Sequence, residues 1–380
     1  MEWKEVDICQ LCDSVSETYK GNASEVVLIN TSDVLAGKCL NHEYVPNKKL
    51  KGQFKKTFRK GDILYSEIRP ANKRFCFVDF EPKDYIASTK LMVLRAHEDV
   101  DPQYLYQILR SNDTLTQLQM LAESRSGTFP QITYSELSNI MVNLPSQKAQ
   151  KNIVSILSSL DRKIELNNKI NADLEEMAQA IFKNWLSECS DDVTIGELSL
   201  NITNYEKTDA EEVVLINSSD VTEGYFDHHN YSPNKNLKGH FKKRFQKGDI
   251  LYSQVRPRNR HWAYCNFDAN DYLASTQLMV IRNNPSLITS ILLYQYIISD
   301  NVWKEFTLKT ETRSGTFPQG NYEDLSQIRV PYNSDVEGIS NQLETLYAKM
   351  FMLEKENSRL SLLRDTLLPR LMSGELEVPE

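Results

Sequence analysis

The sequence predicts an α+β protein in which two similar mixed α/β globules are separated by two long helices that form an antiparallel coiled coil with pseudo-twofold symmetry. Three observations lead to this fold class. Long stretches of the first half return in the second half, each copy begins with short β-type runs, and each copy ends with a heptad pattern. The 380 residues, of which 40% are hydrophobic, provide enough apolar material for more than one domain.

A long internal repeat organises the chain. The heptapeptide KGDILYS at residues 60–66 returns unchanged at residues 247–253, and further segments return after 187 or 188 residues. These segments are VVLIN at 26–30 and 213–217, AST at 87–89 and 274–276, and RSGTFPQ at 125–131 and 313–319. A steady offset of this length indicates a duplicated domain, because solenoid repeats are only about 20–50 residues long.

Each copy divides into a globule and a helix. We expect globules at residues 1–145 and 191–333, a helix at 146–190, and a second helix with a C-terminal tail at 334–380. Runs of β-branched and aromatic residues predict strands at 26–29, 63–65, 75–78 and 91–94. Further helical stretches are expected at 103–121 and 288–306.

The two helical segments show apolar residues at alternating steps of four and three, the pattern of a coiled-coil seam. The seam residues are Ile153, Leu157, Leu160, Ile164, Asn171 and Leu174 in the first helix, and Leu343, Leu346, Met350, Asn357 and Leu360 in the second. The polar Asn171 and Asn357 occupy equivalent positions, where asparagine fixes register and partner. The alternative is that each helix packs on its own globule. A rod of about 57 Å is too long for the flank of one globule, so the paired rod is favoured.

Composition excludes several classes of protein. A net charge of −8 does not fit a uniformly basic DNA-coating protein, and six scattered cysteines do not form a disulfide framework. No apolar run reaches the length of about 18 residues that predicts a membrane-spanning helix, so no membrane association is expected. Because the cysteines do not form a disulfide framework, we expect the reducing environment of the cytoplasm.

The sequence offers no convincing catalytic site, metal site or cofactor site. Glycine-rich phosphate loops and the HExxH motif are absent, and Cys9 and Cys12 have no second pair to complete a metal site. Asp101-Pro102-Gln103-Tyr104 resembles the DPPY motif of amino-methyltransferases, yet no cofactor loop accompanies it. An Asp N-cap followed by proline at the first helical position explains the segment. The chain is therefore expected to be a non-catalytic binding protein, and a diverged methyltransferase is disfavoured.

Three polar strips that recur in both globules are candidates for contact with a polyanion such as DNA. The first contains Lys48, Lys49, Lys51, Lys55 and Lys56, and in the second copy Lys235, Lys238, Lys242, Lys243 and Arg244. The second contains Arg69, Asn72, Lys73 and Arg74, and in the second copy Arg256, Arg258, Asn259 and Arg260. The third contains Arg125, Ser126 and Thr128, and in the second copy Arg313, Ser314 and Thr316.

Each strip also has an ordinary structural explanation. The first could be a solvated lysine-rich face, the second a charged loop with ordinary variation, and the third a turn that leads towards the helix. Duplication of the strips favours function. In the second strip Glu67 of the first copy corresponds to Gln254 of the second, a difference that matters for reading base edges, since glutamine pairs with adenine and glutamate accepts from cytosine.

These features together resemble the specificity subunit of a type I restriction–modification system. The resemblance rests on GDILYS followed by RP, an SGT segment before a proline, a heptad helix, and the duplication of this order over essentially all of the chain. It implies that the globules are target-recognition domains for double-stranded DNA and that the helices are conserved spacer regions.

The resemblance also implies partners. Two methyltransferase subunits would bind S-adenosylmethionine and methylate adenine N6, and two restriction subunits in the full complex would use ATP and Mg²⁺, so this chain itself would hold no cofactor. Candidate contacts with partner subunits are Met177, Phe182, Leu363 and Leu368, which lie off the seam. The alternative is that these side chains cap the ends of the coil against the globules. The visible similarity of the two globules predicts similar, nearly inverted half-sites. The rival hypothesis is a coiled-coil assembly adaptor that does not bind DNA.

Overall fold

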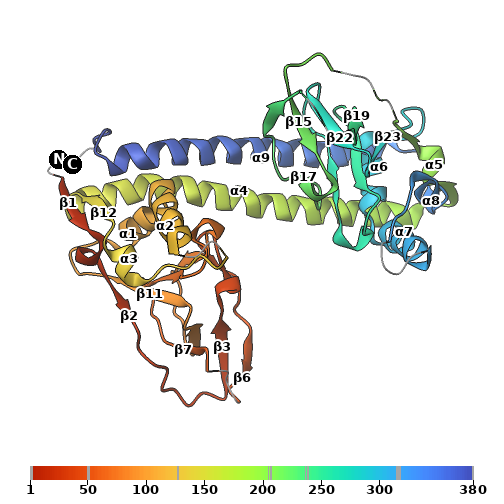
Figure 1. Ribbon diagram of the computed structural model, residues 1–380. Coiled ribbons are helices and arrows are strands. Elements are labelled where there is room, and N and C mark those ends of the chain that lie inside the picture. The colour runs from red at the N-terminus through yellow and green to blue at the C-terminus, as the bar shows by residue number, and fades with distance from the viewer. Residues whose placement is uncertain are drawn as a thin grey trace. The chain divides into compact units, whose positions relative to one another are not determined.

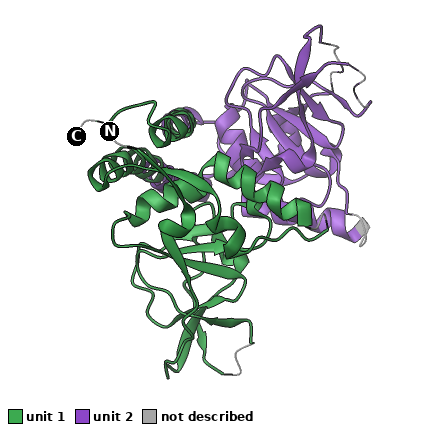
Figure 2. Ribbon diagram, turned by 60° about the vertical axis from the view of Figure 1, so that its left-hand side comes forward, with its two compact units in different colours: residues 1–165, 357–380 green, residues 166–356 purple. Residues whose placement is uncertain are grey.

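The computed structural model describes residues 3–48, 52–125, 128–203, 205, 208–235, 237, 239–313 and 318–378. The chain forms two compact units, which Figure 2 shows in different colours. Unit 1 comprises Met1–Glu165 and Asn357–Glu380, and unit 2 comprises Leu166–Glu356. These units divide both long helices, because each part of a helix packs on the globule of its own unit.

The first copy forms a sheet-rich globule followed by a long helix. Its strands are β1 (Lys4–Asp7), β2 (Cys12–Val15), β3 (Glu25–Ile29), β4 (Val34–Leu35), β5 (Lys38–Cys39), β6 (Tyr44–Pro46), β7 (Phe54–Lys56), β8 (Ile63–Ser66), β9 (Phe75–Phe77), β10 (Tyr85–Ser88), β11 (Leu91–Ala96) and β12 (Met141–Leu144). Its helices are η1 (Ile8–Gln10), η2 (Thr31–Asp33), η3 (Pro70–Asn72), α1 (Pro102–Arg110), α2 (Asn112–Arg125), α3 (Tyr134–Ser138) and α4 (Gln147–Glu188).

The second copy repeats this order. Its strands are β13 (Asp191–Thr194), β14 (Ser199–Asn201), β15 (Glu212–Ile216), β16 (Val221–Thr222), β17 (Tyr225–Phe226), β18 (Tyr231–Pro233), β19 (Phe241–Lys243), β20 (Ile250–Ser253), β21 (Trp262–Tyr264), β22 (Tyr272–Ser275), β23 (Leu278–Asn283) and β24 (Arg329–Tyr332). Its helices are α5 (Ile195–Leu198), η4 (Ser218–Asp220), η5 (Pro257–Asn259), α6 (Ser290–Ile298), α7 (Asp300–Arg313), α8 (Tyr322–Ser326) and α9 (Glu337–Met372).

Two four-stranded sheets form the body of each globule. In unit 1 the strand orders are β2-β11-β8-β9 and β6-β3-β10-β7, and in unit 2 they are β14-β23-β20-β21 and β18-β15-β22-β19. Within unit 1, α1, α2 and α3 lie between α4 and the sheet that contains β11, as Figure 1 shows. The β3 sheet lies beyond that sheet, farther from α4. The predicted α+β class is confirmed.

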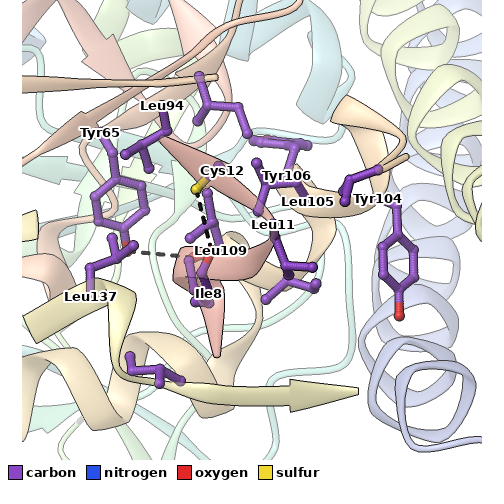
Figure 3. Packing of buried hydrophobic residues seen from close by; sticks show 14 of the residues in the cluster. Ile8, Leu11, Cys12, Tyr65, Leu94, Tyr104, Leu105, Tyr106, Leu109 and Leu137 are labelled. Carbon is purple, nitrogen blue, oxygen red and sulfur yellow. Dashed lines mark hydrogen bonds between the residues drawn. The ribbon is translucent and has the colours of Figure 1, made fainter. Parts of the chain in front are cut away.

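The core of unit 1 joins the first sheet to the helices. Tyr65 and Leu94 from the sheet pack with Leu105 and Leu109 of α1 and Leu137 of α3 (Figure 3). The cluster continues to α4 and the end of α9. Its members there include Ile153, Leu157, Leu368 and Leu371. Burial of this apolar surface stabilises the packing of the helices against the globule.

The helices expected at 103–121 and 288–306 are each broken in two. Ser111 and Ser299 adopt extended backbone conformations between α1 and α2 and between α6 and α7. The hydroxyl of Ser111 accepts the backbone N–H of Thr114 at 3.2 Å and so caps the second helix. Serine competes for backbone hydrogen bonds in this way, which explains why one predicted helix becomes two.

Candidate nucleic-acid interface

The loop at residues 67–74 connects β8 to β9 and contains the short helix η3. Arg69 and Lys73, which bracket η3, have left-handed backbone angles of φ 46° and 52°. Arg256 and Arg260 bracket η5 in unit 2 with φ 48° and 53°. Such angles cost a residue with a side chain about 1–2 kcal/mol. The surrounding contacts must therefore hold each loop in this shape.

The segment at residues 128–132 provides one of these contacts. The N–H of Arg69 donates to the carbonyl of Pro130 at 3.1 Å, and the N–H of Ile132 donates to the carbonyl of Glu67 at 2.8 Å. The Arg69 guanidinium donates to the carbonyl of Thr128 at 3.3 Å. The second and third polar strips are therefore side by side in unit 1.

The turn at residues 88–91 joins β10 to β11 and meets the same loop. The N–H of Glu67 donates to the carbonyl of Lys90 at 3.1 Å, and the N–H of Thr89 donates to the carbonyl of Gln53 at 2.7 Å. Gln53 immediately precedes β7, which carries the end of the first strip. Residues distant in sequence thus meet at one edge of unit 1.

Unit 2 contains the same four backbone bonds at equivalent positions. They run from Arg256 N to Pro318 O at 2.9 Å, from Gly320 N to Gln254 O at 2.9 Å, from Gln254 N to Gln277 O at 2.9 Å, and from Thr276 N to His240 O at 2.8 Å. We call this surface the polar edge. It comprises 53–56, 67–74, 88–91 and 128–132 in unit 1, and 240–243, 254–261, 275–278 and 318–320 in unit 2.

Two lysines of the first strip face inward, which differs from the expectation that they contact DNA. The Lys243 side chain is buried, and its Nζ donates to the carbonyls of Leu278 at 2.6 Å and Thr276 at 3.3 Å. Lys56 is half-buried, and its Nζ donates to the carbonyl of Leu91 at 2.8 Å. Burial lowers the pKa of both ammonium groups. These lysines hold the turn of the polar edge, and Lys243 in particular is not presented to a phosphate.

The other predicted cations and amides lie mostly at the surface. Exposed residues are Lys48, Lys55, Arg69, Asn72, Lys73, Arg125, Thr128, Lys235, Lys242, Arg256, Arg258 and Asn259, whereas Arg74, Arg244 and Arg260 are half-buried. Arg125 forms an ion pair with Glu136 at 3.0 Å. Lys49, Lys51, Ser126, Lys238, Ser314 and Thr316 lie outside the described residues, as does the side chain of Arg313.

In unit 2, helix α7 holds the arginines of the loop. Arg258 donates to Glu311 at 2.7 Å. The Arg260 guanidinium lies 4.4 Å from the ring centre of Trp303, whose Nε1 donates to the carbonyl of Pro257 at 2.9 Å. A guanidinium over an indole is stabilised by the negative face of the ring. The loop arginines are therefore fixed in position by ion pairing and stacking.

Unit 1 holds its loop differently. Ala71 replaces Arg258, and its N–H donates to Gln119 Oε1 at 3.0 Å. Gln119 also donates to Glu123 at 2.7 Å. The two loops therefore share a backbone frame but present different side chains.

Sequence reasoning did not select Lys90 and Gln277 as site residues. Lys90 Nζ contacts Glu67 Oε2 at 3.3 Å and Gln131 Oε1 at 3.1 Å. Gln277 Oε1 accepts from the hydroxyl of Ser218 at 3.4 Å. The repeated tripeptide AST could have pointed to Lys90 and Gln277, because each is the residue immediately after that tripeptide and the two differ between the copies.

Comparisons with known proteins agree with this architecture. Residues 2–176 match the family model described as the type I restriction modification DNA specificity domain. The chain is 47% identical over 186 residues to the type I restriction enzyme HindI specificity subunit of Haemophilus influenzae, covering 48% of this chain and 40% of that relative. Residues 2–176 are therefore similar to the specificity domain of type I restriction–modification systems, and the match to the HindI subunit covers less than half of either chain.

Two specificity subunits match this chain over longer stretches. The type I restriction enzyme MjaIX specificity subunit of Methanocaldococcus jannaschii is 23% identical over 354 residues, which cover 85% of this chain and 79% of that one. The solved type I restriction–modification S subunit of M. genitalium is 16% identical with a TM-score of 0.56, covering 100% of this chain and 97% of its own. This last comparison supports the fold.

The long helices α4 and α9 lie side by side within each unit, and in unit 2 they run antiparallel. In unit 2, Asn167 of α4 donates to Glu356 of α9 at 2.8 Å, and Asn171 donates to the carbonyl of Met350 at 3.3 Å. Residue numbers rise along α4 as they fall along α9, so the two helices run antiparallel. In unit 1, Asp161 of α4 accepts from Arg364 of α9 at 2.9 Å.

The predicted seam residues lie on the inner side of both helices. Buried members are Ile153, Leu157, Asn171, Leu343 and Met350, and half-buried members are Leu160, Ile164, Leu174, Leu346, Asn357 and Leu360. Of the proposed partner contacts, Met177 and Leu363 are exposed. The proposals for Phe182 and Leu368 are wrong, because both side chains are buried in the hydrophobic clusters of their own units.

Asp101 caps α1, as the sequence predicts. Its carboxylate accepts from the N–H of Gln103 at 2.9 Å and from that of Tyr104 at 3.3 Å, and Pro102 begins the helix. The segment that resembles a methyltransferase motif is therefore a helix start. Within the described ranges, no helix combines the length and apolar character needed to cross a membrane.

Proposed function

We propose that this chain is the non-catalytic subunit that reads a bipartite DNA target, with one half-site bound by the globule of each unit. The observation that carries the proposal is the polar edge, which the same four backbone hydrogen bonds build in both units. Each edge combines cations, which suit phosphates, with amide side chains, which suit base edges. A shared frame with different side chains supports half-sites that are similar and nearly inverted repeats.

We further propose that methyltransferase subunits dock on this chain and that restriction subunits join them. In that complex the partner subunits hold S-adenosylmethionine, ATP and Mg²⁺. Exposed apolar residues on α4 and α9, among them Met177 and Leu363, support a docking role for the helices.

The proposal is tested by expressing the chain together with methyltransferase subunits of a type I restriction–modification system and sequencing the methylated DNA of the host. We expect methylated adenines within one bipartite motif whose two parts are related. Affinity of the purified complex for DNA should fall steeply with salt, with a log–log slope of about −0.9 for each phosphate contact. An assembly adaptor would give neither a methylation motif nor salt-dependent DNA binding, and that result would contradict the proposal.

A further inference from the structure

The polar edge contains one side-chain network that changes chemically between the two units. In unit 1 the network is charged, because Lys90 Nζ contacts the carboxylate of Glu67 at 3.3 Å and the amide oxygen of Gln131 at 3.1 Å. The Lys90 side chain is 49% exposed, whereas Glu67 is 24% exposed. The Lys90 ammonium therefore uses two of its three N–H groups in these contacts, and its side chain remains accessible to solvent.

The equivalent network in unit 2 consists of amides. Gln254 replaces Glu67, Gln277 replaces Lys90, and Gln319 corresponds to Gln131. Gln277 is exposed, and its Oε1 accepts from Ser218 at 3.4 Å. The Ser218 contact orients the amide while leaving its NH₂ group directed away from Ser218.

The backbone beneath these side chains is the same in both units. Glu67 N donates to Lys90 O at 3.1 Å, and Gln254 N donates to Gln277 O at 2.9 Å. The inward-facing lysines hold each turn from its buried side. Lys56 Nζ donates to the carbonyl of Leu91, and Lys243 Nζ donates to the carbonyl of Leu278. A rigid frame that places different side chains at one position is the arrangement that base discrimination requires.

We propose that Glu67 with Lys90, and Gln254 with Gln277, each determine one base pair of a half-site, a G·C pair for unit 1 and an A·T pair for unit 2. This inference rests on the proposed function. A lysine ammonium donates to guanine O6 and N7, and a glutamate accepts from cytosine N4. A glutamine amide both donates to adenine N7 and accepts from adenine N6. One good contact of this kind discriminates against the wrong base by roughly tenfold or more.

The test converts the network of unit 1 into that of unit 2. The full chain carrying E67Q and K90Q is purified with its methyltransferase subunits and used to select DNA from a library randomised in one half-site, alongside methylation sequencing in the host. We expect the preference at one base pair to change from G·C to A·T by about tenfold or more, with the other positions unchanged. The reciprocal variant with Q254E and Q277K should change one pair of the other half-site from A·T to G·C.

A charge-matched control is available in the same globule. Glu81 and Lys83 lie in the exposed loop before β10, whereas Lys90 follows the far end of β10, so E81Q with K83Q should leave the motif unchanged. A motif that stays unchanged in both network variants, or a preference that weakens equally at all positions, would overturn the inference. A wild-type complex that selects and methylates no sequence would instead overturn the proposed function, and this inference with it.

Discussion

The guanidinium of Arg282 holds both carboxylate oxygens of the buried Asp249, at 2.7 and 2.8 Å. Asp249 is the aspartate of the second KGDILYS segment, and it also accepts the N–H of Gln246 at 2.8 Å. Unit 1 repeats this pair with Arg95 and Asp62, both bonds being 2.8 Å. The most repeated motif of the sequence is therefore a structural motif, which closes the turn before the central strand β8 or β20.

Replacement of Asp249 by asparagine should destabilise unit 2. The change removes the buried negative charge that faces Arg282 and replaces one of its two acceptor oxygens with an NH₂ donor, and because that arginine is partly exposed we expect a loss of about 2 kcal/mol. Hydrogen exchange measured by mass spectrometry should show faster exchange in β20 and β23. The matched change D62N should accelerate exchange in unit 1 alone. Equal effects of either change on both units would contradict this assignment.

The adjacent Lys242 and Lys243 of the first strip should differ in their effect on the salt dependence of DNA affinity. Lys242 is exposed, so K242M should reduce the salt dependence of DNA affinity by a slope of about 0.9. Lys243 is buried and bound to carbonyl groups, so K243M should leave that slope unchanged. Titration of DNA binding at several salt concentrations makes the comparison. A loss of slope in K243M equal to that in K242M would contradict the inward role of Lys243.

The stability of unit 2 should fall as pH rises between about 4.5 and 7. Burial raises the pKa of Glu354 from its ordinary 4.5 to about 7, while a hydrogen bond from Asn266 acts in the opposite sense and Glu175 raises it further. Burial, with Glu223, also raises the pKa of Glu175. In this range the folded state retains a proton that the unfolded state has released, so the proton-linked stabilisation is lost as pH rises.

The variant E354Q should weaken this dependence, because the glutamine does not titrate. Thermal melting of the protein between pH 5 and 8 provides the measurement, and E344Q, at an exposed position of the same helix, is the control. A pH profile of E354Q identical to that of the wild type would assign the effect to another group.

The length of the paired helices should set the gap between the half-sites. Four residues added to α4 and four to the facing part of α9 lengthen the rod by about 6 Å, close to two base pairs of DNA. The methylated motif of such a complex should carry a gap about two base pairs longer. A gap that does not change would show that the helices do not measure the distance.

The sequence predicted those parts of the molecule that depend on local periodicity and duplication. The heptad steps place Ile153 and Leu343 on buried helix faces, and the Asp101-Pro102 pair begins a helix, because local spacing decides which face is apolar and where a helix starts. The break at Ser111 was missed, since serine is compatible with both a helix interior and a cap.

By itself, the sequence determined that this protein has two copies of one globule and two helices with heptad seams, because duplication and heptad periodicity can be read directly from the order of the residues. Only the tertiary structure decided which side chains share a surface. It brought Glu67, Lys90 and Gln131 together and turned Lys243 inward, because these contacts depend on strand pairing between segments far apart in the chain. Lys242 and Lys243 cannot be distinguished in the sequence, but successive side chains of a strand point to opposite faces, so one is exposed and the other is buried.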